Sequence, residues 1–215
     1  MKRRRRASQR RPQKRIMVAR QPLPAAGFVF RAPQKTANLK ELKYHDVSQN
    51  NAGIDVTGVI YSLSDPAQGD QNTNRNGSVI SMKHFQIRLS LTGADAYNTF
   101  RIIIFRWMRA GTPTATNVLP AGATSPVAPL QNLDINNGKF IQVLYDKLVT
   151  TLGSTSASNY HVNIKKFIDL KNAQAHWLGA AGGRDKGHLY MLIRSDSGAA
   201  GHPSIEFLSR LRFFG

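Results

Sequence analysis

From about residue 41 onward, apolar residues recur in short runs with the spacing typical of β-strands. The run at 79–91 alternates strictly, with Phe85, Ile87 and Leu89 on one face and polar residues between them. A period of two places alternate side chains on opposite faces of a strand, so this run predicts a half-buried strand. Runs of strand character occur at 41–47, 54–63, 79–91, 99–108, 140–150, 160–170, 188–194 and 204–214.

The run at 99–108 differs from the others because it is apolar on both faces. A strand of this kind is expected to be central in its sheet, or to be covered by a neighbouring subunit. The aromatic residues Tyr61, Phe105 and Trp107 are accordingly predicted to lie in the core. Burial between subunits is the alternative, since obligate assemblies also bury aromatic residues.

Turn-forming residues separate the runs, including Asn-Gly pairs at 76–77 and 137–138. The segment 111–130 contains four prolines, and it is predicted to be an extended surface loop. The Gly-rich segment 180–187 lacks the spacing of a phosphate-binding P-loop and is interpreted as a loop. Eight strands and no clear helix predict an all-β fold of two sheets, for which an eight-stranded jelly-roll sandwich is one solution among several.

Charge is concentrated at the N-terminus of this +18 chain. Residues 1–20 contain ten basic residues and no acidic one, so self-repulsion predicts an arm that is disordered when unbound. A proline-bearing linker over 21–40 and a folded domain over 41–215 are expected to follow. The ten predicted nucleic-acid-binding residues are Lys2, Arg3, Arg4, Arg5, Arg6, Arg10, Arg11, Lys14, Arg15 and Arg20.

These cations are expected to bind phosphates by releasing condensed counterions, which gives strong affinity without sequence preference. Arginine can also hold phosphate oxygens through two parallel hydrogen bonds. The short cluster at 2–6 is suited to nuclear import as a second use. Outside the arm, the chain has only twenty basic residues against twelve acidic ones, so the positive charge is strongly one-sided.

Several other classes of protein are excluded by what the sequence lacks. It has no cysteine, no apolar run long enough to span a membrane and no signal-peptide core, so neither disulfides, membrane association nor secretion is expected. No catalytic or cofactor motif is found, so we predict that the protein is not an enzyme and has no cofactor. Binding of calcium by carboxylates at subunit contacts stays an open alternative, although no calcium-binding loop can be recognised in the sequence. The acidic residues considered are Asp65, Asp70, Asp185 and Asp196.

Residues 58–119 resemble the coat proteins of satellite tobacco necrosis virus and of small circular single-stranded DNA viruses. The most specific part is the pattern Q-G-D-x4-R-x-G-x2-I at 68–80, which leads into two consecutive strands. The first strand, K-E-L-K-Y-H-D-V, is more similar to the DNA-virus group. The resemblance is carried by residues 58–60, 68–80, 84–93, 99–107 and 109–119, with weaker similarity at 40–47, 140–148 and 189–197.

The resemblance implies a single jelly roll, a closed icosahedral shell and an arm that faces the genome. We therefore expect a capsid protein of the virion that self-assembles into a T=1 shell of about sixty copies and packages single-stranded DNA in preference to RNA. Passage through the host nucleus during assembly is compatible with the basic cluster. The sequence identifies no host receptor.

A non-viral basic protein, such as a ribosomal or chromatin component, is the alternative. A dedicated reader of bases is expected to have a recognition helix, or aromatic residues interleaved with Lys or Arg along a strand. Neither pattern is evident in the sequence, which favours the coat protein.

Overall fold

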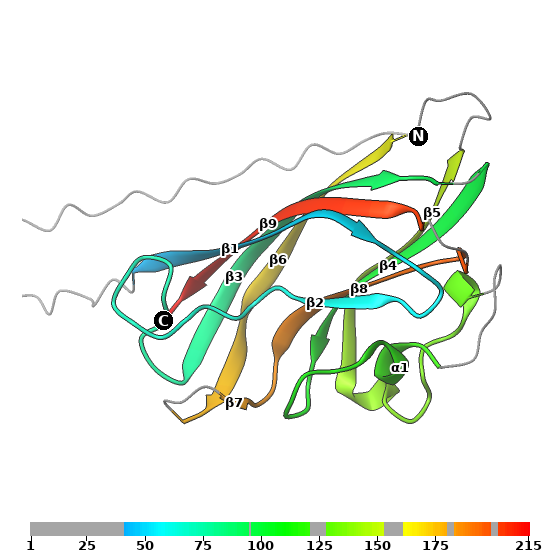
Figure 1. Ribbon diagram of the computed structural model, residues 1–215. Helices are drawn as coiled ribbons and strands as arrows, with labels where there is room; N and C mark the ends of the chain where they lie inside the picture. Colours follow the sequence, from blue (N-terminus) through cyan, green and yellow to red (C-terminus); the bar gives the residue numbers. More distant parts are fainter. Residues whose placement is uncertain (1–40, 95, 121–127, 153–160, 180–182, 199–201) are drawn as a thin grey trace, which may run out of the picture. The chain divides into compact units, whose positions relative to one another are not determined.

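The structure is a computed structural model that describes residues 41–94, 96–120, 128–152, 161–179, 183–198 and 202–215 (Figure 1). None of the helices in these ranges has the length and apolar character needed to cross a membrane. The strands are β1 (Leu42–Gly53), β2 (Val59–Ser62), β3 (Val79–Thr92), β4 (Tyr97–Trp107), β5 (Ile141–Leu152), β6 (His161–Leu178), β7 (Gly183–Arg184), β8 (His188–Ser195) and β9 (Ser204–Phe214). The helices are α1 (Ala115–Val118) and the 3-10 turns Ala128–Leu130 and Gly138–Phe140.

The strands form two antiparallel sheets with a jelly-roll strand order. The five-stranded sheet has the order β1-β9-β3-β6-β7, and the four-stranded sheet has the order β2-β8-β4-β5. In Figure 1 the C-terminal strand β9, in red, lies between β1 and β3. Two such sheets, wound from eight antiparallel strands with the chain passing repeatedly from one to the other, are the double-sheet jelly roll. The predicted all-β jelly roll is therefore confirmed.

The core lies between the two sheets and follows the predicted alternation. In β3, Phe85, Ile87, Leu89 and Leu91 are buried, while the polar residues that alternate with them are partly or fully exposed. Tyr61 packs edge-on against Phe207 with the ring centroids 5.0 Å apart, which confirms its place in the core. The core residues include Ile80, Phe85, Ile87, Leu91, Ile205, Leu211 and Phe213 from the first sheet and Phe100, Ile102, Ile104, Leu189, Met191 and Ile193 from the second.

The second apolar face of β4 is covered by the protein's own chain. Ile103, Phe105 and Trp107 point away from the central core and form a separate buried cluster with Val118 and Leu119, from α1 and the residue after it. The prediction of an extended surface loop at 111–130 is therefore wrong in part, because its described residues include a helix and buried side chains. The physical reason is that these few apolar residues bury the outer face of β4, which no polar loop could do.

Three strands differ at their ends from the sequence prediction, and the first of them, β1, continues from the predicted end at residue 47 to Gly53. The run 54–63 yields a strand only from Val59, because the Asp55 carboxylate accepts hydrogen bonds from the backbone N–H groups of Thr57 (2.9 Å) and Gly58 (3.1 Å) and closes a turn. Strand β6 continues beyond the predicted end at residue 170, to Leu178.

This extension of β6 begins with a bulge, which lies between the residues of β6 that pair with His84 and with Met82 of β3. Lys171 and Asn172 have positive φ angles of 51° and 61°, and they occupy the bulge, where the chain kinks and then resumes pairing. The short strand β7 pairs with the end of β6, where Arg184 lies opposite Trp177. The sequence prediction missed β7 because it interpreted the whole Gly-rich segment as a loop.

A close backbone approach makes glycine necessary at position 187. Gly187 has φ of 85°, and a Cβ there would lie 2.1 Å from the carbonyl oxygen of Gln174. We expect Gly187→Ala to lower the free energy of unfolding by about 1–3 kcal/mol more than Gly111→Ala, through overpacking. Gly111 is a matched control because it also has a positive φ, of 88°, but open space around its Cβ position. Urea unfolding checks this, and equal losses in the two variants would contradict it.

His188 lies in a buried polar cluster beside the connection between β2 and β3. Its ring nitrogens lie 3.3 Å from the carbonyl oxygen of Ser64 and 2.7 Å from that of His176. Burial lowers the pKa of His188, and these hydrogen bonds oppose the shift only in part. Next to it, burial would raise the pKa of Asp65, but hydrogen bonds from Arg184 and Trp177 bring that pKa below its usual value.

This cluster predicts a loss of stability in mild acid. The unfolded chain binds protons on His188 and His45 below about pH 6.5, whereas burial lowers the pKa of both side chains in the fold. The free energy of unfolding should therefore fall as the pH drops from 7.5 to 5.5, by at most about 1.4 kcal/mol per histidine per pH unit. Urea unfolding of dilute, unassembled protein at both pH values measures the effect.

The variant His188→Gln should have a smaller difference between the two pH values. His161→Gln, a change at an exposed position, is the control and should keep the difference of the unchanged protein. Equal stability at pH 7.5 and 5.5 in the unchanged protein would contradict the prediction.

Candidate nucleic-acid interface

The ten basic residues predicted to bind nucleic acid, Lys2, Arg3, Arg4, Arg5, Arg6, Arg10, Arg11, Lys14, Arg15 and Arg20, lie outside the described residues. The same holds for the linker at 21–40. The arm and its boundaries therefore stay predictions.

The outer face of the five-stranded sheet has no covering helix or apolar cluster in the described part of the chain. Its side chains come from β1, β9, β3 and β6, and the antiparallel register places them in rows across the strands. One row contains Ser48, Leu208, Arg88 and Lys165; the next contains Asp46, Arg210, Gln86 and Phe167; the third contains Tyr44, Arg212, His84 and Asp169.

Three cations on this face have no polar partner in the described part of the chain. Arg88, Lys165 and Arg212 are all exposed, and none of the three makes a hydrogen bond or an ion pair there. Arg210 differs, because its guanidinium donates two hydrogen bonds to Asp46, at 2.8 and 2.7 Å, which raises its pKa. The three unpaired cations are thus available for an anionic ligand.

Aromatic rings lie among these cations. Phe167 is 59% exposed, an unusual state for a ring on a sheet, and its only ring neighbour among the described residues is His84, at 5.3 Å between centroids. The guanidinium of Arg210 lies over the ring of Tyr44, with its Cζ atom 4.9 Å from the ring centroid of Tyr44. Exposed Leu208 adds an apolar surface beside Arg88.

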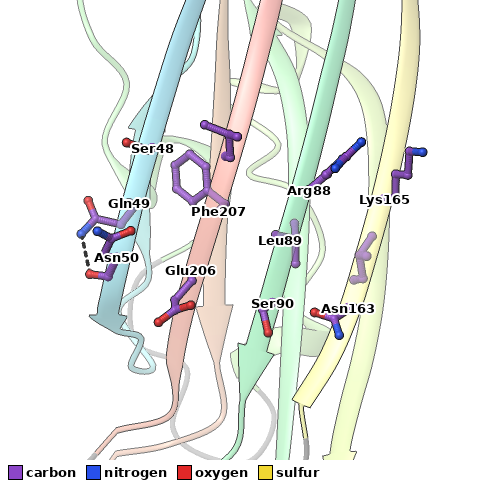
Figure 2. Close-up of a pocket in the computed structure, with 12 residues that line it drawn as sticks. Ser48, Gln49, Asn50, Arg88, Leu89, Ser90, Asn163, Lys165, Glu206 and Phe207 are labelled. Carbon is purple, nitrogen blue, oxygen red and sulfur yellow. Dashed lines mark hydrogen bonds between the residues drawn. The ribbon is translucent and has the colours of Figure 1, made fainter.

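The rows enclose a series of hollows along the face. A shallow, open hollow of about 640 Å³ lies at one end of the face. Figure 2 shows Arg88 and Lys165 together on one side of this hollow, and Glu206 and Ser90 toward the other. A smaller hollow of about 270 Å³ is lined by His84, Gln86, Phe167, Arg210 and Arg212.

Sequence reasoning missed this surface. It looked for aromatic and basic residues interleaved along one strand, whereas here Phe167 comes from β6 and its cationic neighbours Arg210 and Arg212 come from β9. Most of this interleaving runs across strands and exists only once the register is formed, although Lys165 comes two residues before Phe167 on β6 itself. The alternation of Lys165 and Phe167 with buried Ile164 and Ile168 was a signal that could have indicated this face, as was that of Arg88 with buried Leu89.

The acidic residues considered for calcium are not brought together. Among the described residues no group of three or more His, Asp or Glu side chains could hold a metal ion. Asp65 instead forms an ion pair with Arg184.

Comparisons with known proteins place the chain in a family. The sequence model of the satellite tobacco necrosis virus coat protein family matches residues 35–204. A comparison with curated proteins gave no significant match. Among solved structures, the chain is similar to the Desmodium yellow mottle tymovirus structure, with 12% identity, a TM-score of 0.34 and coverage of 95% of this chain and 96% of that one. It is also similar to the unassembled VP1 pentamer of KI polyomavirus, with 10% identity, a TM-score of 0.23 and coverage of 80% and 93%.

The family match spans most of the chain, from before β1 into the start of β9. It includes the Q-G-D-x4-R-x-G-x2-I segment on which the sequence resemblance rested. Coat proteins are structural proteins of the virion and not enzymes, as the sequence predicted. The chain belongs to the satellite tobacco necrosis virus coat protein family.

Proposed function

We propose that this coat protein packages a single-stranded viral genome through residues 1–20, inside a shell of about sixty copies. The observation that carries the proposal is the arm's composition, ten cations and no acidic residue in twenty positions. Such a segment has the charge to neutralise phosphates and too little apolar surface to fold by itself.

Charge balance supports a small genome. With ten cations in each arm and about sixty copies, the arms supply on the order of 600 positive charges. The full chains, at +18 each, supply on the order of 1,100 in a shell of that size. These charges correspond to the phosphates of a genome of roughly one to two thousand nucleotides.

Single-stranded DNA is the proposed cargo in preference to RNA, because the first strand of the fold is more similar to the DNA-virus group. The cluster Lys2–Arg6 is proposed to serve nuclear import as well, as a second use of the same basic residues.

The test is to express the full chain, isolate particles by size exclusion, and record absorbance at 260 and 280 nm with negative-stain microscopy. We expect uniform spheres with a nucleic-acid-rich absorbance ratio, and cargo that is digested by DNase after the particles are opened. Cargo digested by RNase alone would contradict the preference for DNA. A monomer that binds nucleic acid without forming spheres would contradict the shell.

A further inference from the structure

Phe167 lies between cations on both sides, at positions set by strand register. Phe167 shares its row with Gln86, and the neighbouring row on one side contains the pair Arg88 and Lys165. This pair is two residues from the Phe167 row and therefore about 7 Å away along the strands. On the opposite side, at the same spacing along the strands, the row of His84 contains Asp169 on β6 and Arg212 on β9. The Asp169 carboxylate lies 3.7 Å from the ring nitrogen of His84, and Arg212 is the unpaired cation of this row that lines the same hollow as the exposed ring.

This arrangement matches the chemistry of single-stranded nucleic acid. Proteins that bind single strands combine cations that follow the phosphates with aromatic rings on which bases stack. We propose that the outer face of the five-stranded sheet binds single-stranded nucleic acid, with a base stacked on Phe167 and phosphates held by Arg88 and Lys165 on one side and Arg212 on the other. The proposal rests on the proposed function, since it assigns a second contact for the same cargo.

The hollow beside the ring has the groups to hold a base. It is lined by His84, Gln86, Phe167, Arg210 and Arg212, so polar side chains surround the ring. The Gln86 amide offers both a donor and an acceptor to the edge of a base. Arg210 is held by Asp46 and stacked on Tyr44, and it therefore forms a fixed wall of the hollow and not a mobile phosphate ligand.

A single strand fits this face better than a duplex or a protein partner. In a duplex the bases are stacked on one another, so none is free to lie on Phe167. At protein interfaces, charged residues are depleted from the buried centre, whereas here the unpaired cations Arg88, Lys165 and Arg212 lie in the rows on either side of the ring. Charge complementarity therefore points to a polyanion with exposed bases.

The first test measures binding of a fluorescent 20-nucleotide oligo-dT to the full-length chain by anisotropy. Phe167→Ala should weaken binding by about 5- to 150-fold, the effect of losing one stacked base, and Phe167→Tyr should restore it. Tyr97→Ala is the matched control, since Tyr97 is 70% exposed in the other sheet, and it should leave the affinity unchanged. Binding of a duplex of the same length should not respond to Phe167→Ala.

The second test separates the phosphate contacts from the stacking contact. In a plot of log affinity against log salt concentration, Arg88→Gln with Lys165→Gln should reduce the slope by about 1.4, which is about 0.7 per contact with a single strand. Arg109→Gln with Lys147→Gln changes the same number of exposed charges elsewhere and should have less effect on the slope. Phe167→Ala should lower the affinity and leave the slope unchanged.

Ultraviolet crosslinking to bromodeoxyuridine in the oligonucleotide, followed by mass spectrometry, locates the bound base in the unchanged protein. An adduct on β3, β6 or β9 near Phe167 supports the proposal. Unchanged affinity in Phe167→Ala together with adducts confined to other segments would overturn it, as would a defect in shell assembly with unchanged affinity, which would mean that a second copy covers the face. Replacing the arm cations tests the proposed function separately, because that change leaves this face intact.

Discussion

Replacing all ten arm cations by glutamine is expected to yield shells that are largely empty. Each contact with a phosphate of a single strand contributes about 0.7 to the slope of log affinity against log salt concentration, so ten contacts amount to roughly four orders of magnitude between 50 and 200 mM salt. The substitutions change none of the described residues that form the two sheets, which begin at Leu42. Assembly should therefore survive while the cargo is lost.

The ratio of absorbance at 260 and 280 nm of purified particles measures this loss, with negative-stain microscopy to count intact shells. A matched control replaces the eight arm arginines by lysine, which keeps the charge and removes only the two-pronged geometry. It should package close to a normal load. Glutamine-substituted shells that carry as much nucleic acid as the unchanged protein would refute the role of the arm.

A charge placed beneath α1 should have the largest effect on the fold. Ile103 is fully buried in the cluster that α1 covers, with Phe105 and Leu192 beside it. Ile103→Glu would bury a carboxylate with no basic partner in that cluster, and the expected loss exceeds about 4 kcal/mol. Because domains of this kind are stable by about 5–15 kcal/mol, we expect little or no soluble, assembled protein.

Soluble yield and particle counts after size exclusion check this prediction. Tyr97→Glu is the control on the same strand, since Tyr97 is 70% exposed and a charge there remains hydrated. Ile103→Val should be tolerated, with a loss of about 0.5–1.5 kcal/mol. Normal yield and assembly of Ile103→Glu would mean that the outer face of β4 is open to water.

The two sheets differ in a way that bears on function. On the outer face of the four-stranded sheet, α1 and the residues around it cover the apolar cluster of Ile103, Phe105 and Trp107. The outer face of the five-stranded sheet has no such cover in the described residues, and it carries Phe167, Arg88 and Arg212. The apolar patch of the first sheet is therefore buried within one chain, whereas the exposed ring and cations of the second face solvent.

Strands could be predicted from the sequence because their signal is local. Phe85, Ile87 and Leu89 alternate with polar residues, and this alternation needs only neighbouring positions to be recognised. The two-faced apolar character of the run at 99–108 likewise predicted its burial. It did not predict what covers it, because Val118 and Leu119 belong to a segment whose prolines indicated an exposed loop.

The sequence alone determined the chemistry of the arm and the existence of the eight main strands, since charge density and residue alternation are properties of short segments. Only the tertiary structure decided which faces those strands share. Phe167 and Arg210 are 43 positions apart in the printed chain, and they line one hollow because β6 and β9 both pair with β3. Pairing between distant strands depends on the whole sandwich, and a shift of one residue would turn Phe167 into the core.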